Sequence, residues 1–227
     1  MTEDAPRSRD VQNLEQFAAN VAHDFNNLLT GILGNLELME TRAKRTGALQ
    51  FAGYIDGARN SAVRAAAFAQ RLLAFSGRGE QEAAAVDLNL LLQDALEPLR
   101  AQGFQVIFMP AAEPMVLVCD SAQAELALHE LLRNAAEALP EHGEVEGRLE
   151  KHNGAIRLTI RDAGAGMAPE ILARALEPFF STRPNGAGKG LGLPIAERFV
   201  RQLGGTMTLA SEPGVGTTIC MNFPLRA

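Results

Sequence analysis

The stretch NVAHDFNNLLTGILGNLELM, residues 20–39, decides how the first third of this chain folds. Around it, apolar or small residues recur at alternating steps of three and four, with one gap at Asn35: Val11, Leu14, Ala18, Val21, Phe25, Leu28, Ile32 and Met39. This spacing predicts a helix with a heptad seam. His23 lies outside the seam, with Asp24 beside it and Asn27 one turn further along the same face. An imidazole is therefore predicted to project into water from a rigid helix.

His23 has neighbours that suit nucleophilic chemistry. A lone histidine on a helix is most often a solvated surface residue. Here Asp24 can accept a hydrogen bond from one ring nitrogen, which leaves the lone pair of the other nitrogen to attack an electrophile. Asn27 can orient a water or an incoming group without adding charge. The three residues are therefore candidates for a catalytic site.

Composition excludes several classes of protein. The 227 residues allow one or two domains, and 47% hydrophobic with 21% charged residues is typical of a soluble globular chain. A net charge of −6 gives no electrostatic reason to expect nucleic acid or an anionic membrane as the main partner. The sequence shows no signal-peptide core and no apolar run of membrane-spanning length. We therefore expect a cytoplasmic chain without membrane insertion. Cys119 and Cys220 each lie in an apolar segment, so we expect them to be small core residues.

The sequence divides into four segments. We expect a disordered tail at 1–9, a helical hairpin at 10–76, a linker at 77–86 and an α/β sandwich domain at 87–227. The second helix, from about 49 to 75, carries small or apolar residues at heptad spacing: Ile55, Ala58, Ala62, Ala65, Ala69 and Leu72. A hairpin alone leaves its apolar stripe in water, so we predict that two copies pair into a four-helix bundle as a homodimer.

The second half alternates helices and strands. Asp87 should cap a helix to about Ala101, and Ser121 a helix through Leu139. FQVIFM and MVLVCD should be strands, and GEVEGRLEK and AIRLTIRD a hairpin around Asn153-Gly154. After irregular sequence at 163–189 with a short helix at 169–176, we expect a helix at 191–203 and two strands, GTMTLAS and VGTTICMNFP.

Polar residues in HELLRNAAEAL form the first of four local signals. Glu130, Asn134 and Glu137 are spaced four and three apart, so they share one helix face. Carboxylate and amide oxygens suit Mg²⁺, whose remaining ligands can be water and phosphate oxygens. A solvated polar face is the alternative for this pattern taken alone.

The other three signals are rich in glycine. Asp162, Gly164 and Gly166 directly follow a strand, where a carboxylate can accept from a base amino group and glycines let a flat ligand approach. In the segment STRPNGAGKGLGL, Gly186, Gly188, Gly190 and Gly192 precede or open a helix whose free N–H groups can bind phosphates, and Arg183 and Lys189 add positive charge. This is not a Walker A loop. Thr217, in the turn GVGT, offers a hydroxyl to the base.

Taken together these motifs resemble the bacterial sensor histidine kinases over about residues 11–224. HDFNNLL with Gly31 and Asn35 resembles their phosphoacceptor box, and the four later signals resemble the N, G1, F, G2 and G3 boxes of their ATP-binding domain, whose fold gyrase-type ATPases share. The resemblance implies that His23 takes the γ-phosphoryl of ATP and that Asp24 assists. It also implies that Asn27 helps to dephosphorylate a response regulator receiver domain.

The resemblance further implies ATP and Mg²⁺ as cofactors. Asn134, with Glu130, would bind the metal, Asp162 would bind the adenine amino group, and Phe179-Phe180 would anchor a mobile lid over the phosphates. Glu137, Leu191 and the glycines and cations named above would complete the nucleotide site.

Two residues depart from the pattern. Lys189 stands where the family usually has threonine, and Glu130 stands where many kinases have asparagine. Because gyrase-type ATPases use a glutamate there to activate water, Glu130 is also a catalytic candidate.

Other interpretations of the chain remain open. The residues before His23 are too few for a sensor domain, so we expect an excised core or a signal from a separate sensor protein. The chain could be a phosphotransfer scaffold with a weak or vestigial nucleotide site, or an enzyme that mainly dephosphorylates its regulator. A gyrase-like ATPase or a serine kinase of the same nucleotide fold would not need the hairpin or His23.

Overall fold

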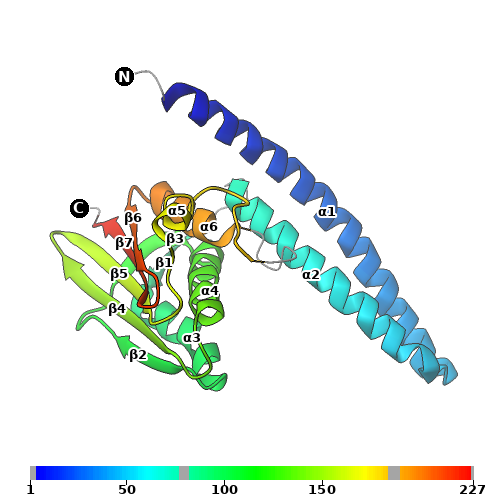
Figure 1. Cartoon of the computed structure of the whole chain (residues 1–227). Helices are drawn as coiled ribbons and strands as arrows, with labels where there is room; N and C mark the ends of the chain where they lie inside the picture. Colours follow the sequence, from blue (N-terminus) through cyan, green and yellow to red (C-terminus); the bar gives the residue numbers. More distant parts are fainter. Residues whose placement is uncertain (1–3, 77–81, 184–189, 226–227) are drawn as a thin grey trace. The chain divides into compact units, whose positions relative to one another are not determined.

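The computed structural model describes residues 4–76, 82–183 and 190–225. The chain divides into two compact units, Met1–Gly79 and Glu80–Ala227. The first is a pair of long helices, and the second combines helices with a sheet (Figure 1). This confirms the predicted fold class of a helical hairpin followed by an α/β domain.

The first unit is a hairpin of α1 (Asp4–Thr46) and α2 (Ala52–Ser76), joined through a short 3-10 helix, η1 (Leu49–Phe51). α1 begins at Asp4 rather than near Asp10, so residues 4–9 are helical and the predicted disordered tail is wrong there. Pro6 is compatible with this start because the first turn of a helix has no partner for its backbone N–H groups. Residues 1–3 lie outside the described part of the chain.

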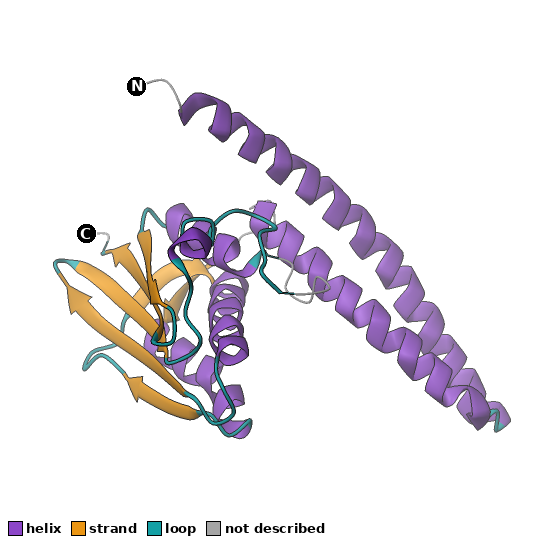
Figure 2. Cartoon of the chain, in the orientation of Figure 1, coloured by secondary structure: helices purple, strands orange, loops and turns teal. Residues whose placement is uncertain are grey.

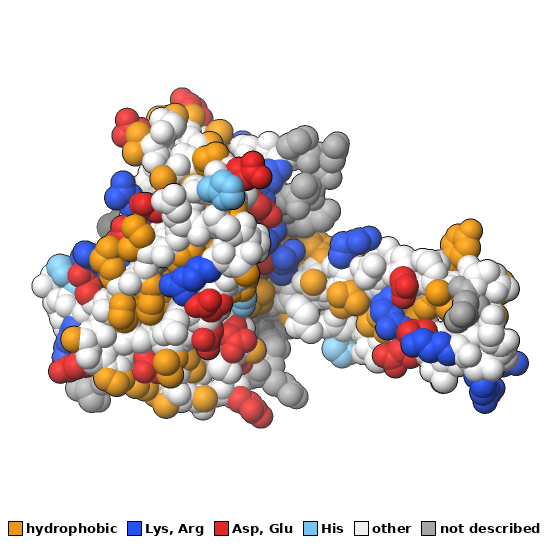
Figure 3. Space-filling model, turned by 90° about the horizontal axis from the view of Figure 1, so that it is seen from below, with side chains coloured by type: hydrophobic (Ala, Val, Ile, Leu, Met, Phe, Trp, Pro, Cys, Tyr) orange, Lys and Arg blue, Asp and Glu red, His pale blue; other side chains and the backbone are white. Residues whose placement is uncertain are grey.

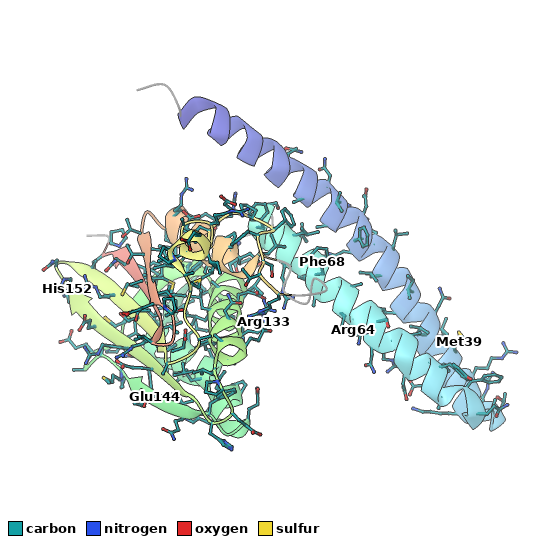
Figure 4. All side chains as sticks on the ribbon, in the orientation of Figure 1. Met39, Arg64, Phe68, Arg133, Glu144 and His152 are labelled. Atoms are coloured by element: carbon teal, nitrogen blue, oxygen red, sulfur yellow. The ribbon has the colours of Figure 1, made fainter. Side chains whose placement is uncertain are left out.

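The contact between the helices shares Ala18 with the predicted seam of α1 and otherwise uses the neighbouring positions. Among the side chains of α1 that the structure describes, the buried hydrophobic ones are Ala18, Ala22, Leu29 and Leu36. Of the predicted seam, Phe25, Leu28, Ile32 and Met39 are 48%, 67%, 48% and 55% exposed. On α2 the predicted stripe holds at Ile55, Ala62, Ala69 and Leu72, which are buried, whereas Ala58 is exposed. Hydrophobic side chains therefore reach the surface of the hairpin (Figure 3), and Met39 is one of them (Figure 4).

The second unit is a two-layer α/β sandwich. Its main sheet has the order β2 (Gln105–Met109), β4 (Glu144–His152), β5 (Ala155–Asp162), β7 (Gly216–Pro224) and β6 (Thr206–Glu212). β2 is parallel to β4, and the other neighbours are antiparallel. The helices α3 (Leu88–Ala101), α4 (Ser121–Ala138) and α6 (Gly192–Gln202) cover one face of this sheet (Figure 2).

Alternating residues build the core between these layers. Inward side chains of β4 and β5 are buried against the helices: Val145, Leu149, Ile156, Leu158 and Ile160. Leu92 and Leu96 of α3 and Leu131 of α4 fill the space between the layers. The opposite face of the sheet is polar, which is the pattern of an antiparallel sheet with one side in water.

Local signals fix several boundaries. Asp87 caps α3 as predicted, accepting from the Asn89 N–H. Asn153 and Gly154 have φ of 50° and 75°, so the β4–β5 hairpin has the turn with two positive φ values that Asn-Gly predicts. The cap of α4 is Asp120, whose side chain accepts from the Gln123 N–H, and not Ser121.

The linker between the two units is shorter than the predicted range 77–86, because its second half forms a strand. A strand, β1 (Ala83–Asp87), pairs with β3 (Val116–Asp120) in a separate two-stranded sheet. Alanine has little intrinsic strand preference, so pairing with β3 overrides local propensity here. Residues 77–81 of the predicted linker lie outside the described part of the chain.

Candidate active site

The second unit contains a cavity of about 310 Å³ beside α4, the ends of β5 and β7 and the start of α6. This volume is at the lower end of the range for small-molecule sites. Its lining includes nine residues that the sequence singled out: Asn134, Glu137, Asp162, Gly166, Phe180, Arg183, Gly190, Gly192 and Thr217. The fold thus brings all four sequence signals to one place.

Asp162, at the end of β5, is the most buried acidic group of the cavity wall. It is 6% exposed, and its Oδ1 accepts from the N–H groups of Gly164 at 2.9 Å and Thr217 at 3.3 Å. Burial raises the pKa of this carboxyl, and the two backbone hydrogen bonds oppose that rise. Because both bonds use Oδ1, Oδ2 is the oxygen that can accept from a ligand. Gly164 therefore positions Asp162 from behind the cavity wall.

Two glycines permit close backbone contacts that no other residue would allow. Gly166 has φ of +63°, and a β-carbon there would lie 1.9 Å from the carbonyl oxygen of Glu212. Gly190 has φ of +64°, and its carbonyl oxygen accepts from the N–H of Phe179 at 2.8 Å. Phe179 itself has a positive φ of 65°. This contact ties together the two ends of segment 180–189, of which 184–189, including Gly186, Gly188 and Lys189, lie outside the described residues.

Arg133 of α4 forms ion pairs with two acidic residues of the same helix, of which Glu137 lines the cavity. The Arg133 guanidinium, which projects from α4 (Figure 4), donates to Glu130 and lies 3.5 Å from Glu137. Arg183 pairs with the other carboxylate oxygen of Glu137. Burial, and then the like charge of Arg133, lower the pKa of Arg183. Two guanidinium groups thus line the cavity, where they could meet an anionic ligand such as a polyphosphate.

Of the two predicted metal ligands, Asn134 lines the cavity and Glu130 is buried in the interior. A β-carbon at Gly192 would lie 2.9 Å from Oε2 of Glu130 and 3.0 Å from Nδ2 of Asn134, so the three residues are neighbours. Asn134 lines the cavity, whereas Glu130 is 2% exposed, is absent from the cavity wall and bonds Arg133. Leu191, also predicted in the site, is buried at the start of α6.

These donors suit a metal that arrives with phosphate. Within residues 4–76, 82–183 and 190–225, no group of three or more His, Cys, Asp or Glu could hold a metal ion. Mg²⁺ commonly takes only one or two protein ligands and completes its shell with water and phosphate oxygens. Asn134, which lines the same cavity as Arg183, therefore fits a metal–polyphosphate complex.

His23 projects from α1 into solvent, as predicted. The side chains of His23 and Asp24 are 73% and 81% exposed. The Oδ1 of Asp24 lies 3.6 Å from Nδ1 of the ring, which is too long for the predicted hydrogen bond, and the amide nitrogen of Asn27 lies 3.4 Å from the same atom. Both contacts that the structure describes for this ring are at Nδ1. The amide nitrogen of Asn27 can only donate, so its contact belongs to the tautomer with the proton on Nε2. Attack through Nε2 requires the other tautomer, in which Nδ1 carries the proton and Asp24 is its nearest acceptor.

Sequence reasoning missed several residues of the site. Arg133 was not selected from the sequence, because only the acidic and amide residues of α4 were considered. An arginine three residues from Glu130 and four from Glu137 can nevertheless pair with both. Met167 and Ile171 line the cavity but carry no motif. Ser211 bonds Thr217 from the neighbouring strand, and only the pairing of β6 with β7 reveals it.

Comparison with known families supports a kinase core. Residues 13–81 match the model of the His Kinase A (phospho-acceptor) domain. Residues 119–227 match the model of the histidine kinase-, DNA gyrase B-, and HSP90-like ATPases. These two matches cover the hairpin with His23 and the unit that holds the cavity.

Individual relatives agree with these models. The sensor kinase CckA of Brucella abortus is 30% identical over 96% of this chain and 25% of its own length. The sensor histidine kinase ZraS of Escherichia coli is 27% identical over 99% of this chain and 48% of its own. The chain thus spans between a quarter and half of these relatives.

Solved structures show the same architecture. Full-length ShkA, in complex with AMPPNP, superposes with a TM-score of 0.74 at 26% identity, covering 92% of this chain and 45% of ShkA. The mycobacterial sensor histidine kinase MprB gives a TM-score of 0.54 at 30% identity, covering 63% of this chain and 97% of that one.

The chain belongs to the sensor histidine kinase family, of which it comprises the catalytic core: a phosphoacceptor hairpin followed by an ATP-binding domain. Among the described residues, none of the helices combines the length and apolar character needed to cross a bilayer.

Proposed function

We propose that this chain binds Mg·ATP in the cavity of its second unit, transfers the γ-phosphoryl group to Nε2 of His23, and then passes it to an aspartate of a response regulator. The observation that carries the proposal is the outward His23, which is 73% exposed and for which the structure describes no contact at Nε2. The AMPPNP held by ShkA, which shares this fold, supports ATP as the nucleotide. We place the activity in the cytoplasm, where ATP is available.

The cavity offers a partner to each part of the nucleotide. Asp162 Oδ2 and the Thr217 hydroxyl would meet the base at the part of the wall made by β5 and β7. Arg183 and the opening turn of α6 at Gly192 would meet the phosphates, because helix N-termini and guanidinium groups attract anions. Mg²⁺, held through Asn134 and the phosphates, would neutralise charge on the transferring group.

His23 then acts as the nucleophile. Its Nε2 lone pair attacks the γ-phosphorus, the N–P bond forms, and the bond to the bridging oxygen breaks, so that ADP leaves. The ring of the product is a positively charged imidazolium that bears the anionic phosphoryl group, and Asp24 stabilises the ring by its charge and can accept the Nδ1 proton. In the second transfer, a receiver carboxylate attacks the same phosphorus and the N–P bond breaks.

The test is labelling with γ-³²P ATP and Mg²⁺. We expect an acid-labile, alkali-stable label that disappears in His23→Gln while ATP affinity measured by calorimetry is unchanged. His152→Gln, on β4, is the matched control and should label like the parent chain. Label that persists in His23→Gln would refute the assignment. Absence of both label and ATP binding in the parent chain would favour the phosphotransfer scaffold.

Asn27 supports a second activity at the same site, dephosphorylation of the regulator. Its amide lies one turn from His23 on an exposed face, where it could orient a water on a phosphorylated receiver. We expect Asn27→Ala to keep His23 labelling and to lose regulator dephosphorylation. Parallel loss of both activities would contradict this division of roles.

The exposed stripe of α1 supports a homodimer. Phe25, Leu28, Ile32 and Met39 are large apolar side chains in water on one side of the hairpin. Pairing two hairpins through this stripe would bury them in a four-helix bundle. A sensor domain or separate sensor protein would then act on this bundle, and the receiver domain would dock around His23.

A further inference from the structure

Ser211 stands behind the cavity in a row of three residues across neighbouring strands. Asp162 of β5 is the cross-strand partner of Thr217 of β7, and Thr217 is the partner of Ser211 of β6. Asp162 and Thr217 line the cavity, and Ser211 does not. Ser211 can therefore affect a ligand only through its neighbours.

The hydroxyl of Ser211 makes three hydrogen bonds. It accepts from the N–H of Met167 at 2.8 Å, donates to the carbonyl of Gly216 at 3.0 Å, and lies 2.9 Å from Oγ1 of Thr217. A carbonyl oxygen can only accept, so the single hydroxyl hydrogen of Ser211 is committed to Gly216. The hydrogen in the Ser211–Thr217 bond must therefore come from Thr217.

This arrangement determines whether the cavity wall donates or accepts hydrogen bonds. With its hydrogen committed to Ser211, Thr217 Oγ1 has only lone pairs to offer to a ligand. Asp162 in its ionised form is also an acceptor, and its Oδ1 is already occupied by two N–H groups. The Asp162 and Thr217 side chains therefore present only acceptors to the cavity, and they suit a ligand edge that donates.

We propose that Ser211 is a positioning residue that makes the site select a 6-amino purine over a 6-oxo purine. It does so by holding Thr217 as an acceptor. This inference rests on the proposed function, in which the cavity binds a nucleoside triphosphate. An adenine amino group donates to Asp162 and Thr217, whereas the 6-oxo group of inosine or guanine brings a third acceptor to the same position. Only the neighbouring N1–H of such a base can still donate, so Thr217 faces the 6-oxo oxygen without a hydrogen between them.

Ser211→Ala removes the acceptor that holds the Thr217 hydrogen. The Thr217 hydroxyl can then rotate and donate to a 6-oxo group. We measure Kd for ATP and for ITP by calorimetry on the full chain with Mg²⁺, because the two ligands differ at position 6 and share the triphosphate. One neutral hydrogen bond gained by ITP should reduce the ATP preference about fivefold.

The controls separate a change in the hydrogen-bonding role of Thr217 from a general loss of nucleotide affinity. Loss of the Met167 and Gly216 contacts in Ser211→Ala should weaken both nucleotides alike, so the ratio of the two Kd values is the informative quantity. Ser211→Thr keeps the hydroxyl and should keep the ratio. Thr208→Ala removes an exposed hydroxyl from the same strand and should change neither Kd. In a Thr217→Val background, Ser211→Ala should no longer alter the ratio.

The outcomes are distinguishable. A parent chain that binds neither nucleotide overturns the proposed function and the inference with it. A parent chain that prefers ATP, with the same preference in Ser211→Ala, overturns the inference alone. A change of ratio that persists in the Thr217→Val background also overturns it, because Ser211 would then act by another route.

Discussion

Replacing Asp162 with asparagine should separate nucleotide binding from folding. The amide has nearly the shape of the carboxyl, and its carbonyl oxygen can still accept from the N–H groups of Gly164 and Thr217. Its second atom, however, becomes an NH₂ group. A donor then faces the amino group of adenine in place of the acceptor Oδ2.

The expected loss of affinity follows from this single bond. A hydrogen bond to a charged group contributes about 1.5–3 kcal/mol, so ATP should bind about 10- to 150-fold more weakly to Asp162→Asn. ITP should lose much less, because the new NH₂ group can donate to its 6-oxo oxygen. The preference for the amino base should therefore fall more than the affinity for the triphosphate.

Stability should move in the opposite direction. Burial raises the pKa of Asp162, so the folded chain holds this proton at a pH where the unfolded chain has lost it. Ionisation above the folded pKa therefore costs folding free energy. The neutral amide avoids that cost. Without nucleotide, Asp162→Asn should be at least as stable as the parent chain at pH 8, and its advantage should shrink as pH falls through the raised pKa.

Calorimetry with ATP and ITP measures the binding term, and urea unfolding between pH 5 and pH 8 measures the stability term. Asp94→Asn, on the exposed face of α3, removes the same charge outside the cavity and should change neither. A variant that binds ATP normally but is destabilised at pH 8 would refute the reasoning, because Asp162 would then be a structural residue and not a ligand for the base.

Three further predictions test the hairpin and the cavity. Gly166→Ala should lower the free energy of unfolding by about 3 kcal/mol, because a β-carbon would lie 1.9 Å from a backbone oxygen. Gly214→Ala is the control: its φ is +76° but nothing lies within 4 Å, so it should cost about 1 kcal/mol. Urea unfolding of the two variants measures the difference. Glu137→Gln should tighten ATP binding about fivefold at low salt by releasing Arg183 for the triphosphate. Weaker ATP binding would instead support Glu137 as a metal ligand. Leu28→Glu should convert the dimer to a monomer in light scattering, and an unchanged mass would exclude this stripe as the interface.

Much of the fold could be predicted because its signals are local. The cap at Asp87 and the turn at Asn153-Gly154 depend on residues within a few positions of each other, and both appear as expected. Asp162 lies in the cavity wall at the end of β5, and its predicted contact with a base stays a prediction. Local rules fail at β1, where three alanines form a strand because β3 pairs with them.

The site contains contacts that a linear pattern does not reveal. Glu130 and Asn134 share a helix face in the sequence, yet Arg133 holds Glu130 in the interior while Asn134 lines the cavity. A helix face is wide enough for one edge to be buried and the other to be open, so spacing alone did not assign the carboxylate. The Ser211–Thr217 bond similarly depends on strand register, which the intervening turn sets.

The hairpin shows why periodicity identifies a helix more securely than it identifies an interface. α1 carries two adjoining apolar stripes, and steps of three and four fit either one. The stripe against α2 begins with the small residues Ala18 and Ala22, while the large Phe25 and Leu28 remain in water. The same buried stripe continues with the large Leu29 and Leu36, so side-chain size does not separate the two stripes. Fully burying a large apolar side chain contributes about 1.5–3 kcal/mol, so Phe25, Leu28, Ile32 and Met39 leave hydrophobic free energy that pairing with a second copy would recover. Exposure in the folded hairpin, and not the period, therefore favours this stripe as the surface for a second copy.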